Sequence, residues 1–189
     1  MNMQQGNLFS NRHNSLLTRS RNISHMFINE SLKSIDEEEL CFINYMKANS
    51  CDEYILLSRY ISFINNNDFS FLDNEFDNSD FSTGVESKNN RIKDLIYKTS
   101  SIMITNNDLI NLVKYKNKRK KGLQLFIIYD NTCNAGRIYL IDLYHMVIPT
   151  EQRLANGKVV PSNPKRLYEG MKKNVKNNVD LCTLRTLVH

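Results

Sequence analysis

A histidine that follows a carboxylate by three residues in an apolar segment, with cations nearby in the sequence, is the feature best suited to chemistry. His145 lies near the end of the apolar segment RIYLIDLYHMVIP, residues 137–149, which Arg137 begins. An imidazole can carry a proton near neutral pH, so His145 is a candidate general acid or base. A histidine that only satisfies its hydrogen bonds at a strand end is the alternative.

Asp142 is the second informative group in that segment. A carboxylate inside a buried strand needs a cation or a hydrogen-bond donor as its partner. Arg137, Arg153 and Lys158 are the candidate partners. Strict alternation along a strand would place Asp142 and His145 on opposite faces, so a direct pair between them is not expected.

A basic run precedes the neighbouring apolar segment in KYKNKRKKGLQLFIIYD, residues 114–130. If residues 123–130 and 137–149 pair as an antiparallel hairpin, Gly122 approaches Tyr144 and His145. Cations, an imidazole and a phenol would then meet at one edge, which suits phosphate binding. The alternative is a solvated helix end, because Lys and Arg side chains also stabilise the last carbonyls of a helix. The run consists of Lys118, Arg119, Lys120 and Lys121.

The two apolar segments predict a sheet that is covered on both faces. Both are β-branched and aromatic, they are separated by the turn-forming NTCNAG, and the second is apolar on both sides. Asn156-Gly157 predicts a second hairpin, and Pro164 predicts the start of a helix. One side of that helix is basic, with Lys165, Arg166, Lys172 and Lys173. Residues 181–188 form one more element of undecided type.

The N-terminal half predicts helices. Two stretches with apolar residues at helical spacing each begin with a capping signal, Ser34 with Glu37 and Ser50 with Glu53. We interpret them as a helical hairpin over residues 31–64. Residues 65–88 read as an acidic-aromatic loop. Further helices are expected over residues 90–98 and, from a third capping signal at Thr105, through residue 116.

Charge is divided along the chain. Residues 36–86 carry 12 acids and 2 bases, whereas residues 88–176 carry 18 bases and 6 acids. Such a division is typical of contact with a polyanion or of pairing within the chain. The phenylalanines of residues 65–84 are either buried anchors of an irregular loop or part of a segment that contacts a protein partner.

Several classes of function lack their motifs. The sequence has no GxGxxG, P-loop, HExxH or GxSxG, and its 4 cysteines form no CxxC pair. We expect no cofactor, no metal, no membrane span and reduced thiols in an intracellular, cytoplasmic protein. The first 29 residues share their acid-free, Arg- and Ser-containing composition with transit peptides, but a flexible basic arm explains them equally well.

These elements predict an α+β protein of 189 residues. A helical N-terminal half would pack on a small antiparallel sheet that is followed by a basic helix. Residues 1–30 would be a flexible basic arm and residues 31–189 a single domain, with helices over residues 89–121 and the sheet with its C-terminal helix over residues 122–189.

The order of LQLFIIYDNTCNAGRIYLIDLYHMVIPT and the later helix NPKRLYEGMKK resembles the core of toxin ribonucleases of the RelE and barnase-like superfamily, over residues 109–173. The resemblance implies metal-independent RNA cleavage with Arg137, His145 and Arg153 as the catalytic positions. No unique motif of the family is present, and the acidic front half has no counterpart in the minimal family fold.

Two hypotheses follow. The first is binding of RNA or another polyanion by the basic run together with Lys165 and Arg166, with toxin-type ribonuclease activity as an extension. The second is a non-enzymatic interaction protein of viral, mobile-element or parasite origin that contacts a protein partner through residues 65–84.

Overall fold

The computed structural model describes most of the chain between residues 24 and 180. The described residues are 24–27, 29–37, 39–47, 51–81, 83–120, 122–130, 132, 135–148, 151–153, 155–161, 164–174 and 178–180. The expected element at residues 181–188 lies outside them.

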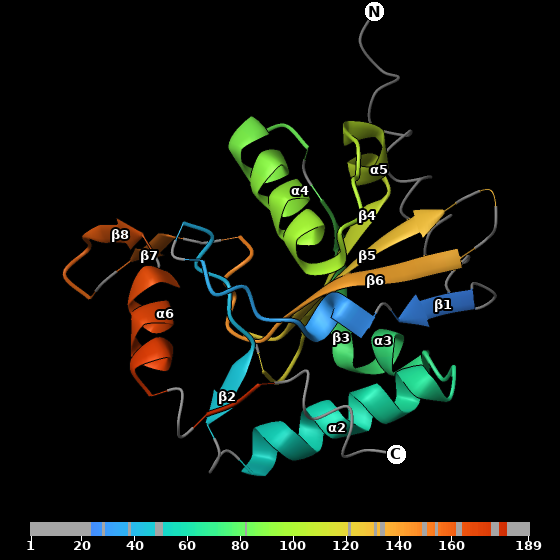
Figure 1. The fold of residues 1–189 in the computed structure, drawn as a ribbon, viewed down its shortest axis with the longest axis horizontal. Helices are drawn as coiled ribbons and strands as arrows, with labels where there is room; N and C mark the ends of the chain where they lie inside the picture. Colours follow the sequence, from blue (N-terminus) through green and yellow to red (C-terminus); the bar gives the residue numbers. More distant parts are fainter. Residues whose placement is uncertain are drawn as a thin grey trace, which may run out of the picture.

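A five-stranded sheet in the order β1-β6-β5-β4-β3 is the centre of the fold (Figure 1). Its strands are β1 (Ser24–Phe27), β3 (Phe76–Asp80), β4 (Leu112–Asn117), β5 (Gln124–Asp130) and β6 (Ala135–Asp142). The pairs β3–β4, β4–β5 and β5–β6 are antiparallel, and β1 joins the free edge of β6 in parallel. Two short antiparallel pairs lie outside this sheet: β2 (Tyr45–Lys47) with β9 (Asn178–Asp180), and β7 (Glu151–Arg153) with β8 (Val159–Pro161).

Helices cover both faces of the sheet. α2 (Cys51–Asn65) and α3 (Ser70–Glu75) share one apolar cluster with Leu125 and Ile127 of β5. α4 (Glu86–Ser100) and α6 (Pro164–Lys173) share another with Phe126 and Ile128. In Figure 1, α2 and α3 lie below the sheet and α4 lies above it. The remaining helices are the short α5 (Asn106–Ile110) and the 3-10 helix η2 (Asn29–Leu32). The expected α+β class and the expected antiparallel sheet, covered on both faces, are confirmed.

The prediction of the first helix of the hairpin is wrong. Ile35 and Phe42 form a β-bridge instead, and the chain then continues into β2. Ser34 does not cap a helix, because its hydroxyl accepts the backbone N–H of Asn44 at 2.9 Å. The second expected helix is present as α2. The N-terminal half therefore contains both helices and strands, and it supplies both edge strands of the main sheet. One of them, β1, lies inside the segment that was expected to be a flexible arm.

Residues 65–88 are not an irregular loop, because they contain α3, β3 and the start of α4. Asp68 accepts the backbone N–H of Ser70 at 3.1 Å where α3 begins. Phe71 and Phe76 are buried and pack around Tyr60, at ring-centroid distances of 5.1 and 5.3 Å. These two aromatic side chains belong to the core, which leaves the acids of this segment on its surface. Charge on the edge strand β3 also protects the sheet from edge-to-edge pairing.

The helix expected from Thr105 to residue 116 ends after one turn. Its capping box is present, since the Asp108 N–H donates to the Thr105 hydroxyl, but α5 ends at Ile110. β4 follows because its side chains alternate, with Val113 and Tyr115 buried against α2 and α3. The other expected elements α4, α6 and the β7–β8 hairpin form where expected, whereas β6 ends at Asp142 and does not reach residue 149.

Candidate nucleic-acid interface

The basic run forms the turn between β4 and β5, and Asn117 shapes it. The Asn117 side-chain oxygen accepts the backbone N–H groups of Arg119 at 3.1 Å and Lys120 at 2.7 Å. Leu123 N–H donates to the Lys120 carbonyl at 2.8 Å and closes the turn. We call residues 118–122 the basic loop.

Two helices hold Asn117 in place. Its side-chain nitrogen donates to the Tyr60 hydroxyl at 2.7 Å, and that hydroxyl donates to Glu75 at 2.7 Å. Burial, followed by the adjacent Glu75 carboxylate, raises the pKa of Tyr60 to about 12. Arg59 forms an ion pair with the same Glu75. The loop is therefore anchored by α2, α3 and β4 together.

The two described lysines of the basic loop, Lys118 and Lys120, contact different helices, α3 and α2. The Lys118 ammonium donates to the carbonyls of Asp73 and Asn74 at 3.3 and 3.1 Å, at the C-terminal end of α3. This is the helix-end role considered as the alternative, although the helix is α3 and not the one expected before the run. The Arg119 side chain is exposed, and Lys121 lies outside the described residues.

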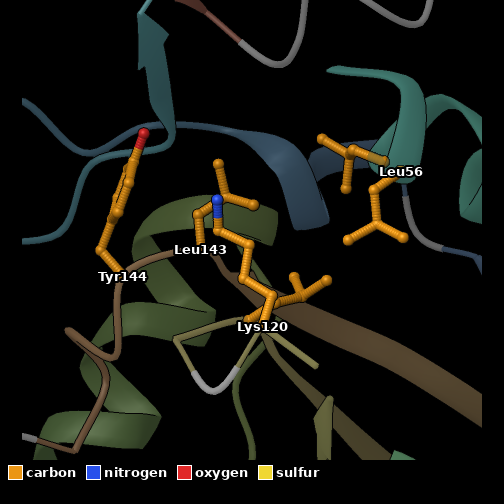
Figure 2. A pocket seen from close by; sticks show the side chains of 6 residues that line it. Leu56, Lys120, Leu143 and Tyr144 are labelled. Atoms are coloured by element: carbon orange, nitrogen blue, oxygen red, sulfur yellow. The ribbon is translucent and has the colours of Figure 1, made fainter. Parts of the chain in front are cut away.

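Lys120 turns toward an apolar pocket. Figure 2 shows its side chain between Tyr144 and Leu56, and the pocket is completed by Leu57, Leu123 and Leu143. Burial lowers the pKa of Lys120, and the charge of Asp52 opposes that shift. The cavity volume is ≈ 10 Å³, about that of one water molecule, so no nucleotide fits there. The pocket is a packing contact between the basic loop and α2.

The expected approach of Gly122 to His145 is confirmed. The His145 N–H donates to the Gly122 carbonyl at 3.1 Å. A Cβ at Gly122 would lie 2.9 Å from the Leu143 carbonyl oxygen, so this close approach requires glycine. His145 itself has a left-handed backbone, with φ 61°.

Arg137 and His145 lie at opposite ends of β6. Arg137 pairs with Ile128 and Met26 near the start of the strand, whereas His145 follows its end. The five-residue step from Arg137 to Asp142 alone spans about 17 Å along a strand. The side chain of Arg153, on β7, lies outside the described residues. The fold therefore does not gather the candidate catalytic trio around His145.

Asp142 is held by the backbone that follows it. Its carboxylate accepts the N–H groups of Tyr144, Met146 and Val147 at 3.2, 2.9 and 2.7 Å. Burial raises the pKa of Asp142, and these three hydrogen bonds and the charge of His145 oppose that shift. Of the three cations expected as partners, Arg137 and Lys158 form no hydrogen bond or ion pair with Asp142 in the described part of the chain, and the side chain of Arg153 lies outside that part.

Arg91 of α4 is the cation associated with this carboxylate. Its guanidinium donates to the carbonyls of Val147 and Met146 at 2.9 and 2.8 Å, and also to Leu40. Burial lowers the pKa of Arg91, while Cys41 and Asp142 oppose the shift. Asp142 and Arg91 thus fix the segment 143–148 through its N–H and carbonyl groups respectively.

No hydrogen bond or ion pair joins His145 to Asp142 among the described residues, as expected, but strand alternation is not the reason. β6 ends at Asp142, so the period of a strand does not extend to residue 145. The left-handed backbone of His145 redirects the chain, and the imidazole acts electrostatically on the Asp142 carboxylate.

A second group of cations lies on the α4 side of β4. Lys114 and Lys116 alternate with Tyr115, on the same face as Leu112, which packs against α4. Burial lowers the pKa of Lys114, and the charges of Lys116 and of Lys88 on α4 lower it further. We call Lys88, Lys114 and Lys116 the α4–β4 lysine cluster. Within the described part of the chain, none of its ammonium groups forms an ion pair.

This cluster was not expected from the sequence, because residues 105–116 were predicted to form a helix. The alternation of Lys with other residues in KYKNK, residues 114–118, has the period of a strand and was the available signal. β3 lies beside β4, with Asp77 opposite Lys116 and Ser79 opposite Lys114. The acidic and basic parts of the chain therefore meet within the sheet itself.

α6 contributes little to a common basic surface in the described structure. Its Lys172 forms an ion pair with Asp36 at 3.1 Å, and Tyr168 donates to the same carboxylate at 2.9 Å. Lys165 is exposed, and the side chain of Arg166 lies outside the described residues.

Comparison with known proteins assigns no relative: no family model, curated protein or solved structure matches the chain. Among the described residues, no group of three or more His, Cys, Asp or Glu side chains is placed to hold a metal ion. No helix in the part of the chain that was described is long and apolar enough to cross a membrane.

Proposed function

We propose that this protein binds a single-stranded nucleic acid through the α4–β4 lysine cluster. The observation that carries the proposal is the convergence of Lys88, Lys114 and Lys116 without a carboxylate ion pair among the described residues. Like charges at a partly desolvated position raise the free energy of the ligand-free chain. A phosphate group placed among them relieves that repulsion.

The spacing of the cluster suits an extended strand of phosphates. Lys114 and Lys116 are two residues apart on the same face of β4, so their Cα atoms are about 7 Å apart. Successive phosphates of a single-stranded nucleic acid have a similar separation. The exposed Arg119 follows the end of β4 in the basic loop, two residues after Asn117.

The proposal is binding and does not include cleavage. Toxin-type cleavage was expected to use Arg137, His145 and Arg153, yet Arg137 lies at the far end of β6 from His145. The order of elements that suggested a ribonuclease is also compatible with a protein that binds nucleic acid and does not cleave it.

A matched pair of variants tests the proposal. Lys114→Gln combined with Lys116→Gln removes two charges from the cluster, whereas Lys93→Gln with Lys98→Gln removes two from α4, at a half-buried and an exposed position outside the cluster. We expect the first pair to weaken binding of a fluorescent single-stranded RNA about tenfold or more at low salt. It should also reduce the slope of log K against log salt by about 1.4, since each phosphate contact contributes about 0.7.

The control pair should leave both quantities close to those of the parent chain. Equal losses in the two pairs would show that net charge and not the cluster determines binding. Absence of binding by the parent chain at low salt would contradict the proposal outright.

A further inference from the structure

Gln124, the first residue of β5, is buried without any hydrogen-bond partner among the described residues. Its side chain is 0% exposed, and in that part of the chain neither its Oε1 nor its Nε2 atom has a partner. Buried amides in native proteins are nearly always paired, so an amide with both atoms unpaired requires an explanation. Burying an unpaired amide costs free energy, and an apolar side chain of similar length would avoid that cost. A binding role would explain why glutamine occupies this position.

The position of Gln124 connects it with the α4–β4 lysine cluster. It is the register partner of Lys116 on one side and of Asp142 on the other. Residues paired directly across an antiparallel sheet point to the same face. Lys116, Gln124 and Asp142 therefore form a row across β4, β5 and β6 on the α4 face.

His145 provides a second, independent observation at the end of this row. Its Nδ1 atom is also buried without a partner in the part of the chain that the structure describes. Its backbone is tied to Gly122, two residues before Gln124, and its charge acts on Asp142. Unpaired side-chain atoms from two separate segments thus flank the same carboxylate.

The unpaired atoms define what a ligand must present. The amide offers one acceptor and one donor side by side, so its complement is a donor beside an acceptor. Asp142 does not supply this complement, because no hydrogen bond joins its carboxyl group to the Gln124 amide among the described residues. The edges of nucleobases carry such pairs, and Gln is a usual bidentate partner of adenine.

We infer that Gln124, assisted by His145, binds the edge of a nucleobase in the strand whose phosphates contact Lys114 and Lys116. This inference rests on the proposed function and adds base selectivity to it. Because Gln124 is fully buried in the ligand-free chain, the base displaces a covering side chain. Lys116 flanks Gln124 in the register, and contact of its ammonium with a phosphate would draw it aside.

The variant Gln124→Met tests the inference, since it keeps the length of the side chain and removes both polar atoms. We expect the parent chain to prefer one homopolymeric RNA over the others by roughly tenfold, the size of one bidentate base contact. In Gln124→Met that preference should disappear, the salt slope should stay unchanged and the melting temperature should rise.

Nuclear magnetic resonance of the side-chain amide gives a second readout that does not depend on the variant. Homotrinucleotides of each base are added to the labelled parent chain, with the Gln152 amide as the internal reference. The Gln124 amide should shift with the preferred trinucleotide and respond less to the others.

The outcomes separate the two proposals. If no RNA binds, the proposed function fails and the inference fails with it. If RNA binds with the expected salt slope but Gln124→Met keeps the base preference, or the amide does not shift at saturation, only the inference is overturned. The Gln124 amide resonance could also shift with a blocked dipeptide amide and with no trinucleotide. That result would assign Gln124 to a peptide ligand and would overturn the inference.

Discussion

Asn117 shows how one side chain can determine the shape of a functional loop. Its oxygen accepts two N–H groups of the basic loop, and its nitrogen donates to Tyr60, which in turn donates to Glu75. Asparagine offers a donor and an acceptor from one planar group, and both are used here. The loop geometry therefore depends on a residue that carries no charge.

Asn117→Ala should lower the free energy of unfolding by about 1–3 kcal/mol, because it leaves buried polar groups without partners. Urea unfolding measures this loss. Asn90→Ala, at an exposed position of α4, is the control and should have no comparable effect. A loss in Asn117→Ala no larger than in the control would mean that the loop holds its shape without the Asn117 oxygen.

At the scale of elements, the capping signals show why part of the fold was predictable and part was not. Thr105 with Asp108 does begin a helix, but a capping box specifies a start and not a length. The signal at Ser34 fails because its hydroxyl bonds Asn44, ten residues away, a contact that local sequence cannot indicate. The central hairpin was predictable because its strands are apolar on both sides, which only a covered sheet satisfies.

Part of the candidate site was likewise predictable from the sequence, and part was not. The approach of Gly122 to His145 followed from antiparallel pairing alone. Lys114 and Lys116 were missed because the helix starting at Thr105 was extended too far. Gln124 could not be singled out, since a polar residue at the start of a strand is ordinary until its neighbours across the sheet are known.

The end of β6 leads to a prediction about pH. Burial raises the pKa of Asp142 above its ordinary value of 3.8, so the native chain keeps this proton where the unfolded chain has lost it. The contribution of Asp142 to stability is then full below about 3.8 and declines as the pH rises through the raised pKa.

Comparison of the parent chain with Asp142→Asn measures this contribution, because asparagine does not titrate. The free energy of unfolding of the parent chain should fall relative to that of the variant between pH 3 and pH 7. Asp77→Asn, which alters an exposed carboxylate of β3, serves as the control. A change in the opposite direction would show that the three N–H donors and Arg91 outweigh the effect of burial.

At the scale of the whole molecule, distant parts of the chain complete two of the three sheets that the structure describes. β1 pairs with β6, more than a hundred residues later, and β9 near the C-terminal end pairs with β2. The Ser31 hydroxyl also donates to the Ile138 carbonyl at 2.8 Å and ties η2 to β6. The acidic and basic halves therefore form one sheet and cannot be treated as separate units.

Removal of β1 tests how far the sheet depends on the N-terminal segment. A chain lacking residues 1–28 exposes the edge of β6, whose unpaired N–H and carbonyl groups can pair with other chains. We expect a lower melting temperature and concentration-dependent association in light scattering. A chain lacking only residues 1–22 retains β1 and should behave like the parent chain, since the basic composition of these residues predicts an arm. Equal losses in both truncations would place the stabilising contacts before β1, whereas no loss in either would show that β6 tolerates an open edge.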